Sequence, residues 1–495
     1  MGVVKRQGIK SGIIGYLGII LGFVGTLWVY PLDFDRYGYI QKLIATATLL
    51  VPILRVGSVA LITKFFAQYH SEGNKGFLTF ICKVTGATIL TSTLTLFIVT
   101  SFIDINIPVF DFINFSSTNF YLIYLLAILM ILVNILKLNA SNYLRIVVPE
   151  IFDNIGLKVT LFIIVITSFV YKVDLILSVT ILLIYYIFHI ISLLLYNKHI
   201  NALKFKGCHL SNISLSLKES MKSYWLFAGL NFFGTILSYK IDVIMIGDMI
   251  DDSHVGYYSA IMFMTIAIQI PLRSILNISS PIISKSIQQK DYDNVIHIYS
   301  KSSINLLIVG VFLFSSVYLN LENITNIMTN GKALIPYLDV FLFLGLAKLF
   351  DVSTSVNNLV MIYSKWYKYN LWLLLFTGVI NIGLNYFLIK QYGIIGAAIA
   401  TAISLFIFNF IKTIIVYFYI DYQPFTKEML IPFAVLVLVI LNPYKLDVGS
   451  GLMNIIINGA ILTLIYVPLI YYSKISKDIN GIVENTMNKL FNNGK

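Results

Sequence analysis

Nine basic residues lie within long apolar stretches of the sequence, where a charged side chain is expensive. They are Lys42, Arg55, Lys83, Lys137, Lys158, Lys240, Arg273, Lys348 and Lys412. Insertion scales put the cost of each at about 2.5–3.5 kcal/mol, so such groups usually face a cavity or a charged partner. The acidic residues within these stretches are Asp153, Asp242, Asp339 and Asp351, with Glu150 at an edge. The excess of positive charge is suited to the passage of an anionic group.

Arg55 and Arg273 are the strongest candidates among these cations. Each follows a proline, Pro52 or Pro271, that can bend its helix toward a cavity. A guanidinium can hold a phosphate through two parallel hydrogen bonds. The alternative is that both side chains extend to lipid headgroups. We predict that the two arginines bind an anionic substrate.

Lys137 and Lys348 are predicted to line the same cationic cavity. Lys137 lies in a polar stripe with Asn134 and Asn139. Lys348 precedes Asp351 by three residues, which places both on one helix face, so mutual neutralisation is the alternative reading. We therefore keep Asp351 both as a pairing partner and as a candidate for ion coupling.

Lys240 and Asp242 are two residues apart and so do not face each other on a helix. Lys240 is the deeper of the two and is predicted to reach the cavity. Asp242 lies about one turn from a helix end. It is either an interfacial carboxylate or a site for a coupling ion.

The remaining embedded lysines have simpler interpretations. Asp153 and Glu150 are close enough in sequence to pair with Lys158. Three others lie near the ends of their apolar stretches and are expected to extend to the membrane surface: Lys42, Lys83 and Lys412.

The composition predicts an all-α integral membrane protein. Of the 495 residues, 58% are hydrophobic and 12% charged, whereas about a quarter are charged in soluble proteins. A membrane-spanning helix needs about 20 apolar residues. About fourteen such spans are predicted, at 12–30, 38–64, 77–103, 119–143, 149–170, 174–196, 221–246, 255–282, 302–320, 334–362, 368–389, 393–419, 429–443 and 451–472. The N-terminal stretch lacks a signal-peptide cleavage site and is taken as the first span.

The loops between these spans differ in charge. One set carries 21 basic residues and the other five, and an excess of Lys and Arg marks the cytoplasmic side. Both termini are therefore predicted to be cytoplasmic. The opposite loops are acidic, with Asp33, Asp35, Asp104, Asp111, Asp248, Asp251 and Asp252.

An internal repeat relates the two halves of the chain. With a shift of 218 residues, Gly38 aligns with Gly256, Tyr39 with Tyr257 and Arg55 with Arg273. Parallel repeats imply a twofold pseudo-axis along the membrane normal, with the site between the halves. The prediction is an N-terminal six-helix lobe at 1–197, a cytoplasmic amphipathic linker at 198–220, a C-terminal six-helix lobe at 221–420, and two extra helices with a cytoplasmic tail at 421–495.

Three stretches resemble the polysaccharide transporter family, especially the O-antigen flippases of the Wzx type. They are "SGIIGYLGIILGFVGTLWVYPLDFDRYGYIQ", "DVIMIGDMIDDSHVGYYSAIMF" and "NNLVMIYSKWYKYNLWLLLFTGVINIGLNYFLIKQYGIIGAAIATAIS". The family belongs to the multidrug/oligosaccharidyl-lipid/polysaccharide exporter superfamily, which also includes MATE multidrug exporters and lipid II flippases. The resemblance implies a two-lobed bundle that translocates a polyprenyl-pyrophosphate-linked oligosaccharide across the bacterial cytoplasmic (inner) membrane by alternating access.

The resemblance also implies partners. These are the lipid-linked oligosaccharide, membrane lipids, and the polysaccharide polymerase and chain-length machinery. The sequence has no nucleotide-binding loop, so H⁺ or Na⁺ is the expected coupling ion, and no cofactor is expected.

Several other functions fit the sequence less well. The basic charge is spread over loops, with no basic face for nucleic acid. Cys82 and Cys208 lack metal or redox spacing, and we predict no metal-ligating or catalytic residue. A membrane glycan polymerase or ligase would need a large basic outer loop. A multidrug exporter, whose substrates are mostly cations, would favour carboxylates, but it remains the nearest alternative together with a lipid II flippase.

Overall fold

The computed structural model describes residues 2–71, 76–102, 118–203, 214–442 and 449–492, and every regular element in these ranges is a helix. Within these residues, eleven helices are long and apolar enough to cross a membrane, or twelve if the bent pair Gly331–Tyr337 and Asp339–Ser353 is one span. The predicted all-helical class is confirmed, and the chain is a multi-pass membrane protein. The predicted number of fourteen spans is not confirmed. Asp104, Asp111 and Cys208 lie outside the described residues.

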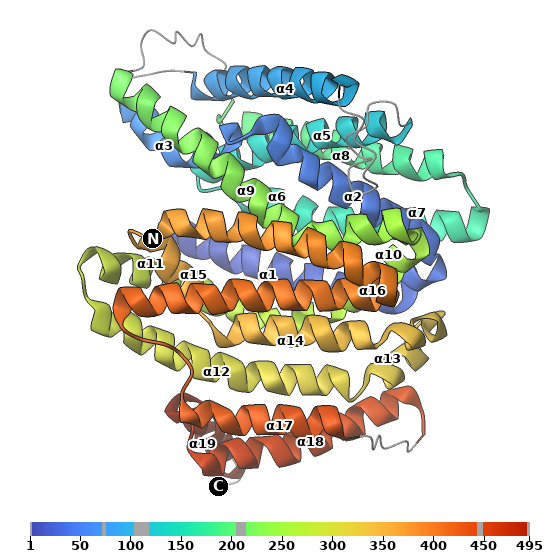
Figure 1. The fold of residues 1–495 in the computed structure, drawn as a ribbon, viewed down its shortest axis with the longest axis vertical. Coiled ribbons are helices and arrows are strands. Elements are labelled where there is room, and N and C mark those ends of the chain that lie inside the picture. The colour runs from blue at the N-terminus through green and yellow to red at the C-terminus, as the bar shows by residue number, and fades with distance from the viewer. Residues whose placement is uncertain (1, 72–75, 103–117, 204–213, 443–448, 493–495) are drawn as a thin grey trace. The chain divides into compact units, whose positions relative to one another are not determined.

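The chain divides into two compact units, and the first runs from Met1 to Ser259. Figure 1 labels its α-helices. The helices of this unit are α1 (Gly2–Val24), η1 (Gly25–Val29), η2 (Tyr30–Leu32), α2 (Phe34–Arg55), η3 (Ser58–Ala60), α3 (Leu61–Ser71), α4 (Phe77–Phe102), α5 (Thr118–Asn142), α6 (Val147–Ile151), η5 (Phe152–Gly156), α7 (Leu157–Tyr171), α8 (Leu175–His199), α9 (Leu215–Met249) and the first turns of α10 (Asp252–Met264).

The second unit runs from Ala260 to Lys495. Its helices are α11 (Ile266–Gln288), α12 (Tyr292–Tyr318), α13 (Leu321–Ile327), η7 (Gly331–Tyr337), α14 (Asp339–Ser353), α15 (Asn357–Tyr363), α16 (Tyr367–Ile420), η8 (Lys427–Met429), α17 (Leu430–Leu441), α18 (Gly451–Ser473) and α19 (Lys477–Asn492).

The predicted span 38–64 is broken in two. Helix α2 ends at Arg55, and Val56 takes a positive φ of 45° before α3 begins. A Cβ on Gly57 would lie 1.7 Å from the Trp225 carbonyl oxygen of α9. Only a glycine allows this close approach of two backbones. The break therefore serves the packing of α2 and α3 against α9.

The predicted spans 368–389 and 393–419 are joined within α16. Gly393 has φ 59° and ψ −138°, so the helix is interrupted there. The chain turns back closely, since a Cβ on Gly396 would lie 2.0 Å from the Leu388 carbonyl oxygen. The residues on either side of Gly393 therefore form two helices of one continuous segment, which is taken as one of the eleven or twelve above, and α17, with 12 residues, is too short to be included. The predicted spans 368–389 and 393–419 correspond to these two helices.

Helix α18 is fixed to α13 and the end of α12 by buried asparagines. Asn458 Nδ2 donates to Asn320 Oδ1 at 3.1 Å, and Asn454 Nδ2 donates to Asn323 Oδ1 at 3.2 Å. Tyr466 adds a hydrogen bond from its hydroxyl to the Ile308 carbonyl at 2.8 Å. Side-chain amides that pair across helices specify register in an apolar environment. The predicted six-helix lobes and linker remain a prediction, and residues 204–213 of that linker lie outside the described part.

Candidate functional site

Arg55 is a buried cation in the first unit. It is the last residue of α2, and its side chain is 7% exposed. The guanidinium carbon lies 4.4 Å from the ring centroid of Phe232 on α9. A desolvated cation–π contact contributes about 2 kcal/mol. No ion pair found among the described residues involves Arg55.

The two backbones approach closely next to Arg55. Gly57 lies against Trp225 and Gly229, and a Cβ on Gly229 would be 2.8 Å from the backbone of Val56. This contact holds the end of α2 on α9 and brings Phe232 beneath the guanidinium. Arg55 is thus positioned by glycines whose role the hydropathy pattern does not show.

Arg273, the predicted repeat mate of Arg55, has a different environment. It lies on α11 in the second unit and is exposed there, whereas Arg55 is buried. The prolines also stand differently relative to the helix breaks. Pro52 lies within α2 and precedes the break at Val56, whereas Pro271 lies within α11 and follows the break at Thr265. The repeat in sequence does not give the two arginines equivalent surroundings.

Lys137 and Asp153 form an ion pair between α5 and η5. Their side chains are 37% and 33% exposed, so the pair is open on one side. Lys158 donates instead to the Gly18 carbonyl of α1. The expected pairing of Asp153 with Lys158 is therefore wrong, because Asp153 pairs with Lys137.

Asp242 is buried within the protein, and the interfacial and ion-coupling roles both stay predictions. Its side chain is 3% exposed, and the Tyr258 hydroxyl donates to its Oδ2 at 2.5 Å. Its Oδ1 accepts from the backbone N–H of Val243 at 2.9 Å. Lys240 is half-buried on the same helix and interacts electrostatically with Asp242.

In the second unit, Asp351 on α14 accepts a hydrogen bond from Gln269 Nε2 at 3.0 Å. Asp351 also interacts electrostatically with Lys412 on α16. Lys412 is 2% exposed, and its Nζ lies 4.1 Å from the Phe408 ring centroid. The expected extension of Lys412 to the membrane surface is thus wrong. Lys348 is half-buried on α14.

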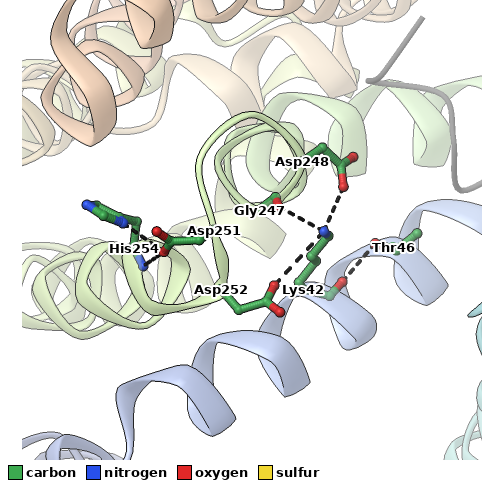
Figure 2. A network of polar contacts seen from close by, with 7 residues as sticks. All are labelled: Lys42, Thr46, Gly247, Asp248, Asp251, Asp252 and His254. Atoms are coloured by element: carbon green, nitrogen blue, oxygen red, sulfur yellow. Dashed lines mark hydrogen bonds and ion pairs between the residues drawn. The ribbon is translucent and has the colours of Figure 1, made fainter. Parts of the chain in front are cut away.

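Lys42 joins α2 to the turn between α9 and α10, as Figure 2 shows. Its Nζ donates to the Gly247 carbonyl at 2.9 Å and lies 2.7 Å from Asp248 Oδ1 and 4.0 Å from Asp252 Oδ1. The side chain is 27% exposed. Lys42 thus pairs within the protein, and its position near the membrane surface stays a prediction. We call residues 34–42 of α2 and 247–257 of α9 and α10 the acidic junction.

The repeat glycines meet within the acidic junction. A Cβ on Gly38 would lie 1.7 Å from the Asp252 carbonyl oxygen and 2.7 Å from the Gly256 nitrogen. Around this crossing, the Ser253 hydroxyl donates to Asp35 Oδ1, and the Phe34 and Tyr257 rings meet edge to face at 4.8 Å between centroids. Helix α2 belongs to the predicted N-terminal lobe and α9 and α10 to the predicted C-terminal lobe. The acidic junction therefore ties segments of both predicted lobes together inside the first unit.

The charge balance of the acidic junction depends on pH. Burial raises the pKa of the Asp252 carboxyl above its ordinary value; Lys42 opposes this rise, and Asp251, Asp35 and Asp248 add to it. A carboxyl whose pKa is raised by folding takes up its proton more readily in the folded state. Its contribution to stability is therefore complete below its unfolded pKa of about 4 and is lost as the pH rises through the folded pKa.

We predict that the Asp252→Asn variant loses this part of the pH dependence. The wild-type unfolding temperature in detergent should rise as the pH falls from about 7 toward about 4, and the rise should be smaller in the variant. The control is Asp293→Asn, an exposed carboxylate at the start of α12. Parallel pH profiles for wild type and Asp252→Asn would contradict the prediction.

An apolar groove of about 350 Å³ lies beside the end of α2. Its walls come from α3, α4 and α9, and Lys218, Lys222 and Trp225 are among its lining residues. Thr88, another lining residue, donates a hydrogen bond to the Arg55 carbonyl at 3.4 Å. The groove thus combines an apolar wall with two basic side chains.

Sequence reasoning missed the roles of Lys42 and Lys412. Each lies near the end of an apolar stretch, where a lysine is expected to extend its ammonium group to the membrane surface. The partners of Lys42 are about 200 positions away in sequence, and only the acidic cluster at 248–252 hinted at them. Packing of α14 on α16 decides the burial of Lys412.

No family model matches the sequence, and no curated protein matches it. Solved structures do match. The lipid II flippase MurJ, in an inward closed conformation, is 16% identical, with a TM-score of 0.65 over 94% of this chain and 99% of its own. An inward-facing MATE multidrug resistance transporter of the MOP superfamily is 11% identical, with a TM-score of 0.51 over 84% of this chain and 98% of its own. A MATE protein in complex with MaL6 is 12% identical, also at 0.51, over 85% and 96%. The chain therefore has the fold shared by these transporters.

Proposed function

We propose that the protein is a flippase that moves a polyprenyl-pyrophosphate-linked oligosaccharide, an O-antigen or capsular repeat unit, across the bacterial cytoplasmic membrane by alternating access. The observation that carries this proposal is Arg55, a guanidinium 7% exposed in an apolar helix, placed on an aromatic ring and in no ion pair among the described residues. A cation kept at this cost is a functional group by default. The planar guanidinium of Arg55 can donate two parallel hydrogen bonds to a pair of phosphate oxygens.

Three further features support an anionic lipid as substrate. The fold is that of flippases and exporters, which makes a transporter a better proposal than an enzyme. The embedded charges are mostly cationic. The groove beside α2 offers an apolar wall for a lipid chain and Lys218 and Lys222 for a negative headgroup.

A lipid II flippase is the second candidate. The MurJ structure named above matches nearly the full length of this chain at a TM-score of 0.65. Both candidate substrates share a polyprenyl pyrophosphate, so the cationic residues serve either one, and only the sugar differs. We propose cytoplasmic termini and an ion gradient as the energy source, which places the acidic junction at the outer side of the membrane.

The proposed roles of Arg55 and Arg273 are tested in proteoliposomes with a lipid-linked oligosaccharide. We expect the double variant Arg55→Ala, Arg273→Ala to lose translocation by about tenfold or more, because a charge-assisted hydrogen bond contributes about 1.5–3 kcal/mol and 1.4 kcal/mol is a factor of ten. The control is Lys83→Ala, which removes an exposed cation from α4. Unaltered translocation by a folded double variant would refute the cationic path.

A further inference from the structure

Helix α11 of the second unit carries a line of polar side chains along one face. Five polar residues recur at steps of three or four positions, which places them on neighbouring turns of that face. We call them the polar face of α11, and they are Gln269, Arg273, Asn277, Ser280 and Ser284. The helix is long and apolar enough to cross a membrane. Polar side chains on such a helix usually face a water-filled cavity or a partner, so this face calls for an explanation.

The remainder of α11 is apolar and has two kinds of surroundings. Ile283 and Ile287 are buried in a core cluster that includes Val360 of α15. Ile278 and Ile282 are exposed on another side of the helix, as suits contact with lipid. At 3.6 residues per turn, the polar face lies between the buried side and the exposed apolar side. It is therefore turned neither into the core nor directly toward lipid.

The middle of the polar face presents two side chains to a ligand. Arg273 and Asn277 are exposed, and no hydrogen bond or ion pair found among the described residues involves either side chain. They lie about 6 Å apart along the helix axis, at 1.5 Å per residue. Gln269, one turn before Arg273, donates instead to Asp351. A guanidinium and a side-chain amide thus lie next to each other on this face.

Tyr363 adds an aromatic ring beside the polar face. It is the last residue of α15, it is 39% exposed, and its hydroxyl oxygen lies 2.7 Å from that of Ser280. Helix α15 is fixed to α11 because Val360 and Ile283 share one buried cluster. Exposed tyrosines commonly serve as anchors at the membrane surface. The hydrogen bond to Ser280 sets Tyr363 apart from such an anchor, because it holds the hydroxyl on the polar face.

We propose that Asn277 and Tyr363 bind the sugar of a lipid-linked substrate whose pyrophosphate is held by Arg273. This rests on the proposed function and names the residues that recognise the sugar. An amide both donates to and accepts from hydroxyl groups, and an exposed ring offers an apolar surface to the C–H groups of a sugar. Ser280 is a positioning residue that orients Tyr363. The sugar is bonded directly to the pyrophosphate, so it must lie close to Arg273.

The order of these residues along α11 suits loading from the cytoplasm. Lys285 and Lys290 follow them in the chain, and basic residues of this kind mark the cytoplasmic side. With the cytoplasmic termini proposed above, Asn277 and Ser280 lie on the cytoplasmic side of Arg273. A headgroup entering from that side therefore places its sugar against Asn277 and Tyr363 when its pyrophosphate reaches Arg273.

The test is equilibrium binding of two radiolabelled lipids to the full-length protein in detergent. One is a polyprenyl-pyrophosphate-linked disaccharide, and the other is the same polyprenyl pyrophosphate without sugar. We expect Tyr363→Ala and Asn277→Ala each to weaken binding of the glycolipid by about three- to tenfold, as the loss of a neutral hydrogen bond or a ring contact would. Binding of the sugar-free lipid should not change. Arg273→Ala should weaken the binding of both lipids.

The matched control is Tyr369→Ala, which removes another exposed tyrosine of the same unit and should change neither affinity. Should Tyr363→Ala fail to fold, Ser280→Ala removes only the hydroxyl that orients the ring, and it should weaken glycolipid binding alone. If the folded variants bind both lipids as wild type does, or lose both equally, the sugar site is wrong and the pyrophosphate site stands. If the wild type binds neither lipid, the proposed function is wrong as well.

Discussion

Replacing Gly38 with alanine is expected to force α2 and α10 apart at the acidic junction. The new methyl group would lie 1.7 Å from the Asp252 carbonyl oxygen and 2.7 Å from the Gly256 nitrogen. Both obstacles are backbone atoms, so no side-chain rotation relieves the overlap. Overpacking of this kind costs about 1–3 kcal/mol. The helices can separate or the protein can lose that stability, and either outcome disrupts the contact between Asp35 and Ser253.

The separation can be measured by crosslinking. Cysteines placed at Asp35 and Ser253, whose side chains touch, should be joined efficiently by a short bifunctional reagent in a Cys82→Ser, Cys208→Ser background. Adding Gly38→Ala should lower the yield several-fold. Adding Gly86→Ala should leave it unchanged, because a Cβ on that α4 glycine meets nothing within 4 Å. An undiminished yield with Gly38→Ala would show that the close approach is not as described.

Replacing Lys42 with glutamine is expected to destabilise the same junction through charge. Lys42 lies 2.7 Å from Asp248 and 4.0 Å from Asp252, and its replacement removes this positive charge from beside both carboxylates. The pair is partly buried, with Lys42 27% and Asp248 16% exposed. The ion pair should therefore contribute about 1–2 kcal/mol to the free energy of unfolding, which lies between the contributions of an exposed and a buried pair.

Thermal unfolding in detergent measures this loss. Lys42→Gln should unfold several degrees below wild type, whereas Lys83→Gln, which removes an exposed lysine from α4, should not. The double change Lys42→Asp, Asp248→Lys should recover part of the lost stability, because it restores an opposite-charge pair. If Lys42→Gln and Lys83→Gln behave alike, the ion pair does not contribute to the fold.

Hydropathy is enough to predict an all-helical membrane protein, because backbone groups in lipid must be satisfied within each segment. It does not predict where helices break. Val56 and Gly393 adopt positive φ at positions that read as ordinary apolar sequence. At the first break, Gly57 contacts the backbone of Trp225, which is distant in sequence; at the second, Gly396 contacts the backbone of Leu388 within α16.

The sequence predicts which types of residue form the candidate site, but it does not predict which residues contact each other there. An embedded lysine or arginine is visible in the sequence, and Arg55 is buried as a functional cation would be. Its aromatic partner, Phe232, is one of 35 phenylalanines, and no local pattern selects it. Asp153, in the π-helical turn η5, pairs with Lys137 on α5 instead of Lys158. Tertiary packing, which no window of sequence contains, decides such partners.

The central claim is that the cargo is an anionic, pyrophosphate-linked glycolipid. The most direct measurement is translocation by the wild-type protein in proteoliposomes, with a polyprenyl-pyrophosphate oligosaccharide, lipid II and an organic cation offered in parallel under an imposed proton gradient. We predict that a pyrophosphate-linked glycolipid crosses and the organic cation does not, with the two glycolipids distinguishing the sugar. Transport of the organic cation without either glycolipid would contradict the account and identify the protein as a multidrug exporter.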